Sequence, residues 1–435
     1  MDMDQLTEVK TKLMEFVEHF RPLLGRSERG HWCSMYLSGL LLDGERKSIE
    51  PMASRLPGGN EQAMQQFVNQ SPWDPSSVLN RLVEVMVDQL RPSPGVLVLD
   101  DTSLPKKGTH SVGVARQYCG ALGKVANCQS VVSWHFAGED LHFPLAGELY
   151  LPKAWTEDSS RMIKAGVPPE RTTFVEKWRL ALSLLDRVKG KVPYEAITFD
   201  AGYGEIRDFL TALDERKELF VGQIPESHGF WPNDVETITA SRSNRGRRRK
   251  YPAVADRRHK PFSAKRWREK LQKDGVPFEA VELPLQSKRT VEALAIRVRQ
   301  ANAKAYYRPG PERWLLIERI GQDSYKYYVS NFPEDAPISR LVSLAHRRWT
   351  VEQGYQQLKE ELGLDHFEGR SWPGLHHHVA LCFMAFCFLV LLQGDHQKKL
   401  PDLASDDPTM AQRPAHDPDL SPLREDQLPR AVGVL

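Results

Sequence analysis

Apolar residues recur at helical spacing near the start of the chain. The first such pattern alternates steps of three and four residues, through Leu6, Val9, Leu13, Phe16 and Phe20. Such spacing places the side chains on one face of a helix. Asp74 followed by Pro75 is typical of a helix N-cap and a first-turn proline, and it precedes another apolar pattern. We therefore expect a helical domain over residues 1–92.

After a linker at 91–95, short continuous apolar runs replace the helical pattern. Residues 96–99 lead into Asp100 and Asp101, and residues 196–199 lead into Asp200. Runs that are apolar on both faces are typical of central strands in a parallel or mixed sheet. Further strands are expected at 117–137, 142–151, 219–224, 314–320 and 325–329. Helices are expected at 174–188, 206–213 and 338–362.

These patterns divide the rest of the chain into four parts. A unit of strands and helices over 93–224 is followed by a mainly β segment over 225–336. A helical pattern of apolar residues returns over 337–396. The apolar run at 379–392 is shorter than the roughly 20 residues that cross a membrane, so we interpret it as a buried core helix. Residues 397–435 are rich in Pro, Asp and Gln, and we expect a disordered tail there.

Composition excludes several classes of protein. The 435 residues are 40% hydrophobic and 27% charged, which is ordinary for a globular protein of two or three domains. The net charge of +2 does not by itself indicate nucleic-acid binding, and acidic residues outnumber basic ones over 1–92, so that domain would dock DNA only through a few residues. Five cysteines without a Cys-x-x-Cys pair favour reduced thiols in a cytosolic protein over disulfides or zinc. The N-terminal segment lacks the pattern of a secretory signal.

One segment is strongly basic. Residues 241–270 carry 13 Lys and Arg against two acidic residues, interleaved with aromatic residues. Its densest part consists of Arg245, Arg247, Arg248, Arg249 and Lys250. Such a patch gives sequence-independent affinity for phosphates, so we interpret it as a DNA contact. The alternative is a solvated, flexible loop.

Three carboxylates are candidates for metal-dependent phosphodiester chemistry. Asp100 and Asp200 follow apolar strands, and ligands gather at the carboxyl ends of parallel strands. Glu352 lies in a later helical segment. A carboxylate cluster can hold two divalent ions, one activating the nucleophile and the other stabilising the leaving oxygen. Hard oxygen ligands suit Mg²⁺ or Mn²⁺. Taken singly, each aspartate could equally be a helix cap or a turn residue.

The helical segment around Glu352 has two faces. Its apolar stripe consists of Leu344, Val351, Leu358 and Leu362. Arg348, Glu352 and Lys359 fall together on an adjacent face, at i, i+4 and i+11. A cation beside an active-site carboxylate can hold DNA phosphates. By itself, an Arg–Glu pair at this spacing is usually a surface ion pair of little energetic value.

The chain resembles a known family, the DDE transposases of bacterial insertion sequences. The resemblance covers residues 30–395. Its three blocks are VLVLDDTSLPKKGTHSVGVARQYCGALGKVANCQ (96–129), TFDAGYGE (198–205) and RRWTVEQGYQQLKEELGLDHFEGRSWPGLHHH (347–378). Related enzymes carry Tyr, two residues, Arg, three residues, Glu, six residues, Lys. Arg348, Glu352 and Lys359 keep this spacing, whereas Ala345 stands at the tyrosine position.

The resemblance implies an α/β fold with a ribonuclease H-like mixed sheet flanked by helices. The catalytic core would span 93–224 and 337–396, interrupted by the mainly β insertion over 225–336. Asp100, Asp200 and Glu352 would bind Mg²⁺, with Mn²⁺ as a substitute, and Asp101 is the rival of Asp100. Arg348, Lys359 and the basic segment would contact DNA.

The function implied is cleavage of transposon ends and strand transfer into target DNA. The enzyme would act on double-stranded DNA, at terminal inverted repeats and at the target, as a homodimer assembled on DNA. It would work in the bacterial cytoplasm at the nucleoid and without a membrane partner. The alternative is a catalytically silent DNA-binding protein derived from a transposase.

Several other signals are weaker. Residues 96–100 also open like a phosphatase of the haloacid dehalogenase type, but Thr102 stands where that class needs a second aspartate. His376, His377 and His378 point in different directions on a helix, which disfavours a joint metal site. We expect them at a helix start or facing DNA. Tyr203 and Lys107 are candidates for contact with a phosphate or a DNA end.

Overall fold

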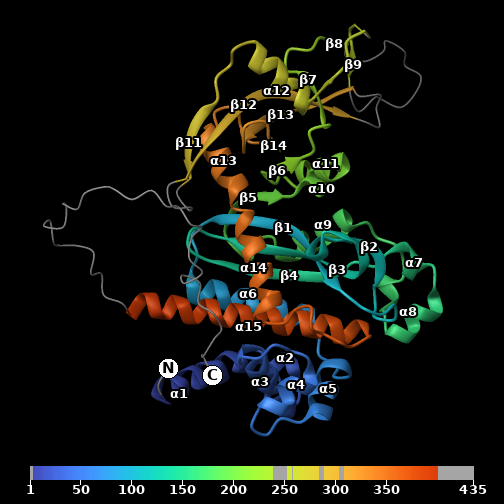
Figure 1. The fold of residues 1–435 in the computed structure, drawn as a ribbon, viewed down its shortest axis with the longest axis vertical. Helices are drawn as coiled ribbons and strands as arrows, with labels where there is room; N and C mark the ends of the chain where they lie inside the picture. Colours follow the sequence, from blue (N-terminus) through green and yellow to red (C-terminus); the bar gives the residue numbers. More distant parts are fainter. Residues whose placement is uncertain (1–2, 239–251, 257, 284–288, 303–307, 400–435) are drawn as a thin grey trace, which may run out of the picture.

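The computed structural model describes residues 3–238, 252–256, 258–283, 289–302 and 308–399. In Figure 1 the helices before residue 70 lie at one end, a first sheet lies in the middle, and a second sheet lies at the other end. The long helix α15 (Trp372–Lys399) runs between those helices and the first sheet, and the helix over residues 75–90 lies beside it on the side of the sheet. The architecture is therefore a mixed α/β arrangement in which distant parts of the chain share one core.

The N-terminal part is helical, as predicted for residues 1–92. Its helices are α1 (Met3–Glu18), α2 (Arg21–Leu24), α3 (Ser27–Leu41), α4 (Ile49–Arg55), α5 (Glu61–Asn69) and α6 (Pro75–Leu90). The predicted cap is present: the Asp74 carboxylate accepts hydrogen bonds from the backbone N–H groups of Ser76 and Ser77, at 3.1 and 2.9 Å. The apolar faces of α1 and α6 are buried in the common core.

The first sheet is mixed, as the apolar runs predicted. Its strands are β1 (Gly95–Pro105), β2 (Ala115–Cys119), β3 (Lys124–Ala137), β4 (His142–Leu149) and β5 (Tyr194–Phe199). β1 pairs antiparallel with β3 and parallel with β5, while β2 and β4 both pair with β3. Strand β1 continues to Pro105, so the expectation that Asp100 ends a strand is wrong. Only the parallel pairing ends there, because β3 remains a partner of β1 to Pro105.

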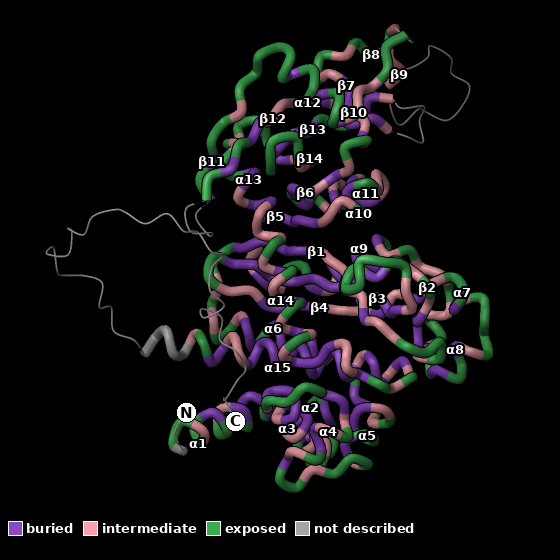
Figure 2. Tube along the Cα trace, in the orientation of Figure 1, coloured by how far each residue is buried: buried purple, intermediate pink, exposed green. Residues whose placement is uncertain are grey.

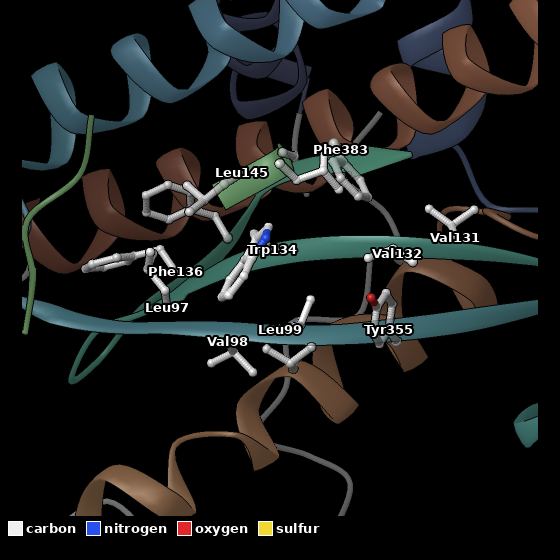
Figure 3. Packing of buried hydrophobic residues seen from close by; sticks show 14 of the residues in the cluster. Leu97, Val98, Leu99, Val131, Val132, Trp134, Phe136, Leu145, Tyr355 and Phe383 are labelled. Carbon is white, nitrogen blue, oxygen red and sulfur yellow. The ribbon is translucent and has the colours of Figure 1, made fainter. Parts of the chain in front are cut away.

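Helices cover both faces of the first sheet. On one face lies α9 (Lys177–Val188), where the Trp134 ring N–H donates to the Ala181 carbonyl oxygen at 2.8 Å. On the other lie α14 (Trp349–Glu360) and α15, with Tyr355 and Phe383 among the packed residues (Figure 3). Smaller helices complete this part: α7 (Lys153–Thr156), α8 (Ser159–Ala165), α10 (Ala201–Gly204) and α11 (Arg207–Glu215). The sheet centre is thereby shielded from solvent on both sides.

The second sheet is antiparallel and follows β5 in the chain. Its strands are β6 (Val221–Ile224), β7 (Gly229–Pro232), β10 (Phe262–Ser263), β11 (Glu279–Leu283), β12 (Arg289–Asn302), β13 (Arg308–Arg319) and β14 (Tyr325–Ser330). A separate short pair consists of β8 (Thr237–Ile238) and β9 (Ala253–Val254). One further helix, α12 (Ala264–Lys273), lies in this part. The strands predicted at 314–320 and 325–329 are present within β13 and β14.

Two predicted helices have different bounds in the structure. The helix expected from residue 174 begins at Lys177, because the Phe174 ring packs against Tyr150, 6.3 Å between ring centroids, outside the helix. The segment expected to be one helix over 338–362 is two helices, α13 (Ile338–His346) and α14. Tight turn hydrogen bonds at Arg347 and Arg348 separate them.

Helix α15 is the buried helix predicted at 379–392. The part from Trp372 to Gly394 is long and apolar enough to cross a membrane, but 83% of its most apolar stretch is buried inside the protein (Figure 2). A helix that is apolar all round belongs in a protein core when neighbours cover it. The helix continues to Lys399, so the expectation of a disordered tail is wrong for residues 397–399; residues 400–435, where the rest of that tail was predicted, lie outside the described residues.

The histidine triplet near the start of α15, His376 to His378, does not face outward. His377 and His378 are buried, and His376 is half-buried. His377 contacts the carbonyl oxygens of Val68 and Trp73, at 2.7 and 2.8 Å, and His378 Nδ1 contacts the Tyr36 hydroxyl at 2.9 Å. The expectation of a helix start is confirmed, whereas a DNA-facing role is wrong, because the N-terminal helices cover this end of α15.

All five cysteines, Cys33, Cys119, Cys128, Cys382 and Cys387, are free and buried. This agrees with the prediction of reduced thiols instead of a disulfide framework. Burial raises the pKa of the Cys33 thiol to about 12. The cysteines therefore act as small core residues.

Candidate active site

Sheet register brings the first two candidate carboxylates together. Leu99 of β1 and Phe199 of β5 are parallel partners, and the pairing ends at this point. Asp100 and Asp200 are the residues that immediately follow. Because parallel strands advance in the same direction, the two aspartates emerge side by side at one edge of the pairing.

The local structure around Asp200 is tightly constrained. The Asp200 carboxylate caps α10 by accepting a hydrogen bond from the Tyr203 backbone N–H at 3.1 Å. A methyl group on Gly204 would come within 1.9 Å of the Gln223 carbonyl oxygen. Only glycine therefore allows α10 to lie this close to β6, and that approach sets the position of the Asp200 cap.

Asp100 and Asp101 face opposite sides of the sheet. Asp100 pairs with Ser133 in the register, and Ser133 Oγ lies 2.5 Å from the Tyr355 hydroxyl of α14. Asp101 pairs with Val132, and its Oδ2 accepts hydrogen bonds from Lys177 Nζ of α9 at 2.6 Å and from Ser130 Oγ at 2.9 Å. Asp101 is thus already neutralised by Lys177, whereas Asp100 faces the helix that carries Glu352.

Burial dominates the electrostatics of the two aspartates. The pKa of Asp100 is raised to about 7, chiefly by burial; the Arg348 guanidinium lowers it, and the carboxylates of Asp200 and Asp101 raise it. Burial also raises the pKa of Asp200, against a hydrogen bond from the Tyr203 backbone. Neighbouring carboxylates at low exposure disfavour ionisation unless a cation is present. A cation bound at this site would therefore favour the ionised forms of Asp100 and Asp200.

Arg348 is the protein's own cation at this site. It lies at the start of α14, half-buried, with Nη1 3.3 Å from Asp100 Oδ2. Its Nη2 forms an ion pair with Glu352, which is in the first turn of α14. The guanidinium therefore links the first and third candidate carboxylates. Glu352 itself is 46% exposed, unlike Asp100 at 14%.

Lys359 lies on the same helix and near the same site. Burial lowers its pKa, and the carboxylates of Asp365 and Asp100 oppose that effect. The predicted arrangement of Arg348, Glu352 and Lys359 on one side of α14 agrees with these neighbours. Lys359 is a half-buried ammonium that adds positive charge near these carboxylates.

A hydrogen-bonded network next to Asp100 was not predicted from the sequence. The Ser133 hydroxyl contacts both His135 Nε2 at 2.8 Å and the Tyr355 hydroxyl, which also lies 3.4 Å from the Asp100 carbonyl oxygen. Burial lowers the pKa of His135 to about 3, so this imidazole is neutral. Tyr355 follows Glu352 by three residues, and that helical spacing was the available signal.

The chemistry of the three carboxylates suits a hard divalent cation, but the described side chains are not gathered around one. Among the described residues, no three His, Cys, Asp or Glu side chains form a group that could hold a metal ion. Glu352 is instead ion-paired with Arg348. A metal would need Glu352 to exchange its partner.

Two other predicted contacts have different outcomes. Lys107 is exposed in the loop after β1, while the adjacent Lys106 donates to the Asp365 and Phe367 carbonyl oxygens at 3.3 and 2.6 Å. The dense basic stretch, Arg245, Arg247, Arg248, Arg249 and Lys250, lies outside the described residues. Its role in DNA contact stays a prediction.

Comparison with known proteins gives two matches. A family model described as DDE superfamily endonuclease matches residues 19–300, which include both Asp100 and Asp200. A protein of Microchaete diplosiphon, described as a probable transposase for insertion sequence element IS701, is 24% identical over 364 residues. The matched region covers 80% of this chain and 82% of that protein.

Proposed function

Because the chain belongs to the DDE superfamily of endonucleases, we propose that it is a transposase that cleaves transposon ends and transfers them into target DNA. The observation that carries the proposal is the register of β1 and β5, which sets Asp100 beside Asp200 while Arg348 tethers Glu352 to Asp100. Two strands and one helix from distant parts of the chain thus contribute one acidic site.

A ribonuclease H-like core is part of this proposal. The strand order β4-β3-β1-β5, with parallel β1 and β5, supports it, as does the Ile197–Phe220 bridge leading from β5 toward β6. The core would span 93–224 and 337–396, with the antiparallel second sheet as an insertion over 225–336. The helices of 1–92, which share the common core, would dock DNA only through a few residues.

In this mechanism Asp100, Asp200 and Glu352 would hold Mg²⁺, with Mn²⁺ as a substitute. When bound, such ions would activate a water molecule or a 3′-hydroxyl and stabilise the leaving oxygen. Glu352 would exchange its ion pair with Arg348 for the metal, and the Arg348 guanidinium would then be available to a DNA phosphate. Lys359 and the basic stretch would hold neighbouring phosphates, and the hydrogen bonds of Tyr355 to Ser133 and to the Asp100 carbonyl oxygen hold α14 against β3 and β1.

The substrates are double-stranded DNA carrying terminal inverted repeats and a target duplex. Two ends must be brought together, so we propose a homodimer assembled on DNA. The protein would work in the bacterial cytoplasm at the nucleoid, as a chain related to an insertion-sequence transposase.

The proposal is tested with purified protein, Mg²⁺ or Mn²⁺, and duplexes that carry the element's ends. Wild-type protein should nick and join these ends. Asp200→Ala and Glu352→Ala should abolish cleavage while end binding survives, because only the carboxylates are lost. Glu360→Ala, which removes an exposed acid from the same helix, is the matched control and should cleave normally.

Wild-type protein that binds the ends but neither nicks nor joins them would support the alternative, a catalytically silent DNA-binding protein. Retention of transposition in cells by both carboxylate variants would do the same.

A further inference from the structure

A polar cleft lies between the N-terminal helices and the part of the chain that contains the first sheet. Its volume is about 660 Å³, which suits a small organic ligand. One wall comes from α4 and α5, and the other comes from α8, the loop after β1 and the segment 367–371 before α15. In Figure 1, α5 and α8 lie on the same side of the molecule, near the start of α15. None of the three candidate carboxylates lines this cleft, so it is a separate site.

The wall formed by α8 and the segment before α15 is cationic. Arg161, Lys164 and Arg370 line it, and none of them forms an ion pair with a carboxylate of the described residues. The Arg161 guanidinium lies over the Trp155 ring, 3.8 Å from its centroid, and Nη2 donates to the Thr109 carbonyl oxygen. These two contacts fix the orientation of the guanidinium plane. A wall of cations that no acid of the protein balances favours an anionic ligand.

The opposite wall, on α4 and α5, carries groups that recognise the edges of nucleobases. Gln65 and Gln70 present side-chain amides, and Glu50 and Glu61 present carboxylates; all four residues are exposed. Amides pair with adenine, and carboxylates accept from the amino group of cytosine. These carboxylates would repel a simple anion from this side of the cleft. Cations on one wall and base-binding groups on the other therefore suit a nucleotide better than a phosphate ion.

The elements that carry the first and third candidate carboxylates both lead into the cleft. Strand β1 continues into the loop 106–114, and α14 continues into the segment 361–371. The two connections touch, because the Val112 backbone N–H donates to the Arg370 carbonyl oxygen at 3.1 Å. From Asp100 to the end of β1 the strand covers five residues, roughly 17 Å or about five nucleotide steps. One DNA strand is thus long enough to occupy the acidic site and the cleft together.

We propose that this cleft binds an unpaired stretch of DNA strand. Its phosphates contact Lys164 and Arg370, and a base stacks on the Arg161 guanidinium and meets the amides of α5. A cleft of this volume takes one drug-sized unit such as a nucleotide, whereas a duplex presents two strands together. The inference rests on the proposed function only for the choice of DNA as the nucleotide polymer.

The test measures binding of short fluorescent single strands, and of the matching duplexes, to the full chain in EDTA. Replacing both Lys164 and Arg370 by Ala removes two exposed cations from the cleft. Single-strand affinity should fall roughly tenfold or more, and the slope of log affinity against log salt should fall by about 0.7 for each phosphate released. Duplex affinity should change much less. The matched control replaces Lys10 and Lys124, two exposed cations outside the cleft, and should bind like wild-type protein.

The amide wall is tested separately with Gln70→Ala. This change removes a group that would bind a base but leaves every cation in place. Single-strand affinity should therefore fall several-fold while the salt slope stays as in wild-type protein. The contrast between the two slopes distinguishes a site for a whole nucleotide from a surface that attracts phosphates alone.

Several results would overturn the inference. Equal losses of single-strand and duplex affinity in the cation variant would show that these residues contact ordinary duplex. Unchanged single-strand affinity in that variant, or an equal loss in the control, would remove the cleft from DNA binding. Displacement of the strand by a free mononucleotide at equal concentration would indicate a small-molecule site instead. Because no step needs metal or turnover, protein that binds single strands in the cleft but never cleaves DNA would refute the transposase function alone.

Discussion

At the scale of single residues, one guanidinium pairs with two of the three candidate carboxylates. Arg348 forms ion pairs with both Asp100 and Glu352. All three side chains are partly exposed, and contact with water weakens these ion pairs. An uncompensated buried carboxylate is far costlier than a paired one. The side chain that would later bind DNA therefore serves first as the counter-ion that allows the site to exist without metal.

Ionisation of Asp100 should make stability and metal binding depend on pH in opposite senses. Its pKa rises from 3.8 to about 7 on folding, so the folded chain favours the protonated form. Stability of the metal-free protein should fall as pH rises from about 4 to about 7, by up to about 4 kcal/mol, and then level off. Denaturant unfolding at several pH values measures this.

Mn²⁺ affinity should rise over the same interval, up to tenfold per pH unit, because the metal binds the ionised form. Asp100→Asn provides the control, since it should remove most of the stability change. A wild-type stability profile equal to that of Asp100→Asn would contradict the assignment.

Replacing Arg348 by Ala should strengthen metal binding and weaken DNA binding. In Arg348→Ala, Glu352 no longer has to leave an ion pair, so Mn²⁺ affinity should increase by about tenfold, the equivalent of about 1.4 kcal/mol. Calorimetric titration measures the gain. Arg340→Ala, which removes an exposed pair with Glu195, should leave Mn²⁺ affinity unchanged. Weaker Mn²⁺ binding in Arg348→Ala would refute the exchange of partners by Glu352.

At the scale of elements, α10 is the short piece that positions Asp200. Gly204→Ala should destabilise the protein by roughly 1–3 kcal/mol, because the added methyl meets backbone that cannot turn away. Cleavage should fall with it, since the cap at Asp200 must shift. Thermal unfolding and end cleavage measure both effects.

Gly108→Ala is the matched control for this change, because nothing lies within 4 Å of its added methyl group. If Gly204→Ala melted and cleaved like wild-type protein, the close approach of α10 to β6 would not set the position of Asp200.

Prediction from the sequence worked best where one local pattern decides the structure. The apolar runs before Asp100 and Asp200 are buried on both faces, so the mixed sheet and the meeting of these aspartates followed from pattern and chain direction. The choice between Asp100 and Asp101 could not be made from alternation. It depends on Lys177, a residue 76 positions away that binds Asp101 from the opposite face.

Tertiary contacts explain the failures. The histidine triplet was expected at a helix start, which is confirmed, or facing DNA, which is wrong: Val68 of α5 and Trp73 of the following loop supply acceptors for His377 that no local pattern near residue 377 reveals. The burial of Tyr203 and the Ser133–Tyr355 contact were likewise invisible, because neighbours at long sequence separation define them.

At the scale of the whole molecule, the basic stretch should govern how DNA binding responds to salt. Replacing Arg245, Arg247, Arg248, Arg249 and Lys250 together by Ala should reduce the slope of log affinity against log salt by about 0.9 for each phosphate that the protein no longer neutralises. Binding of end duplexes measured at several salt concentrations gives the slope. An unchanged slope would indicate a solvated loop that does not touch DNA.

The position of helix α15 near the end of the chain determines when the core can be completed during synthesis. It packs between the first sheet and the N-terminal helices, with Phe16 against Phe388 and Tyr36 against His378. A ribosome makes α14 and α15 after every other element described, so a nascent chain lacks both Glu352 and the central support of its earlier helices. An interrupted translation product would therefore lack both the third candidate carboxylate and the helix that joins the first sheet to the N-terminal helices.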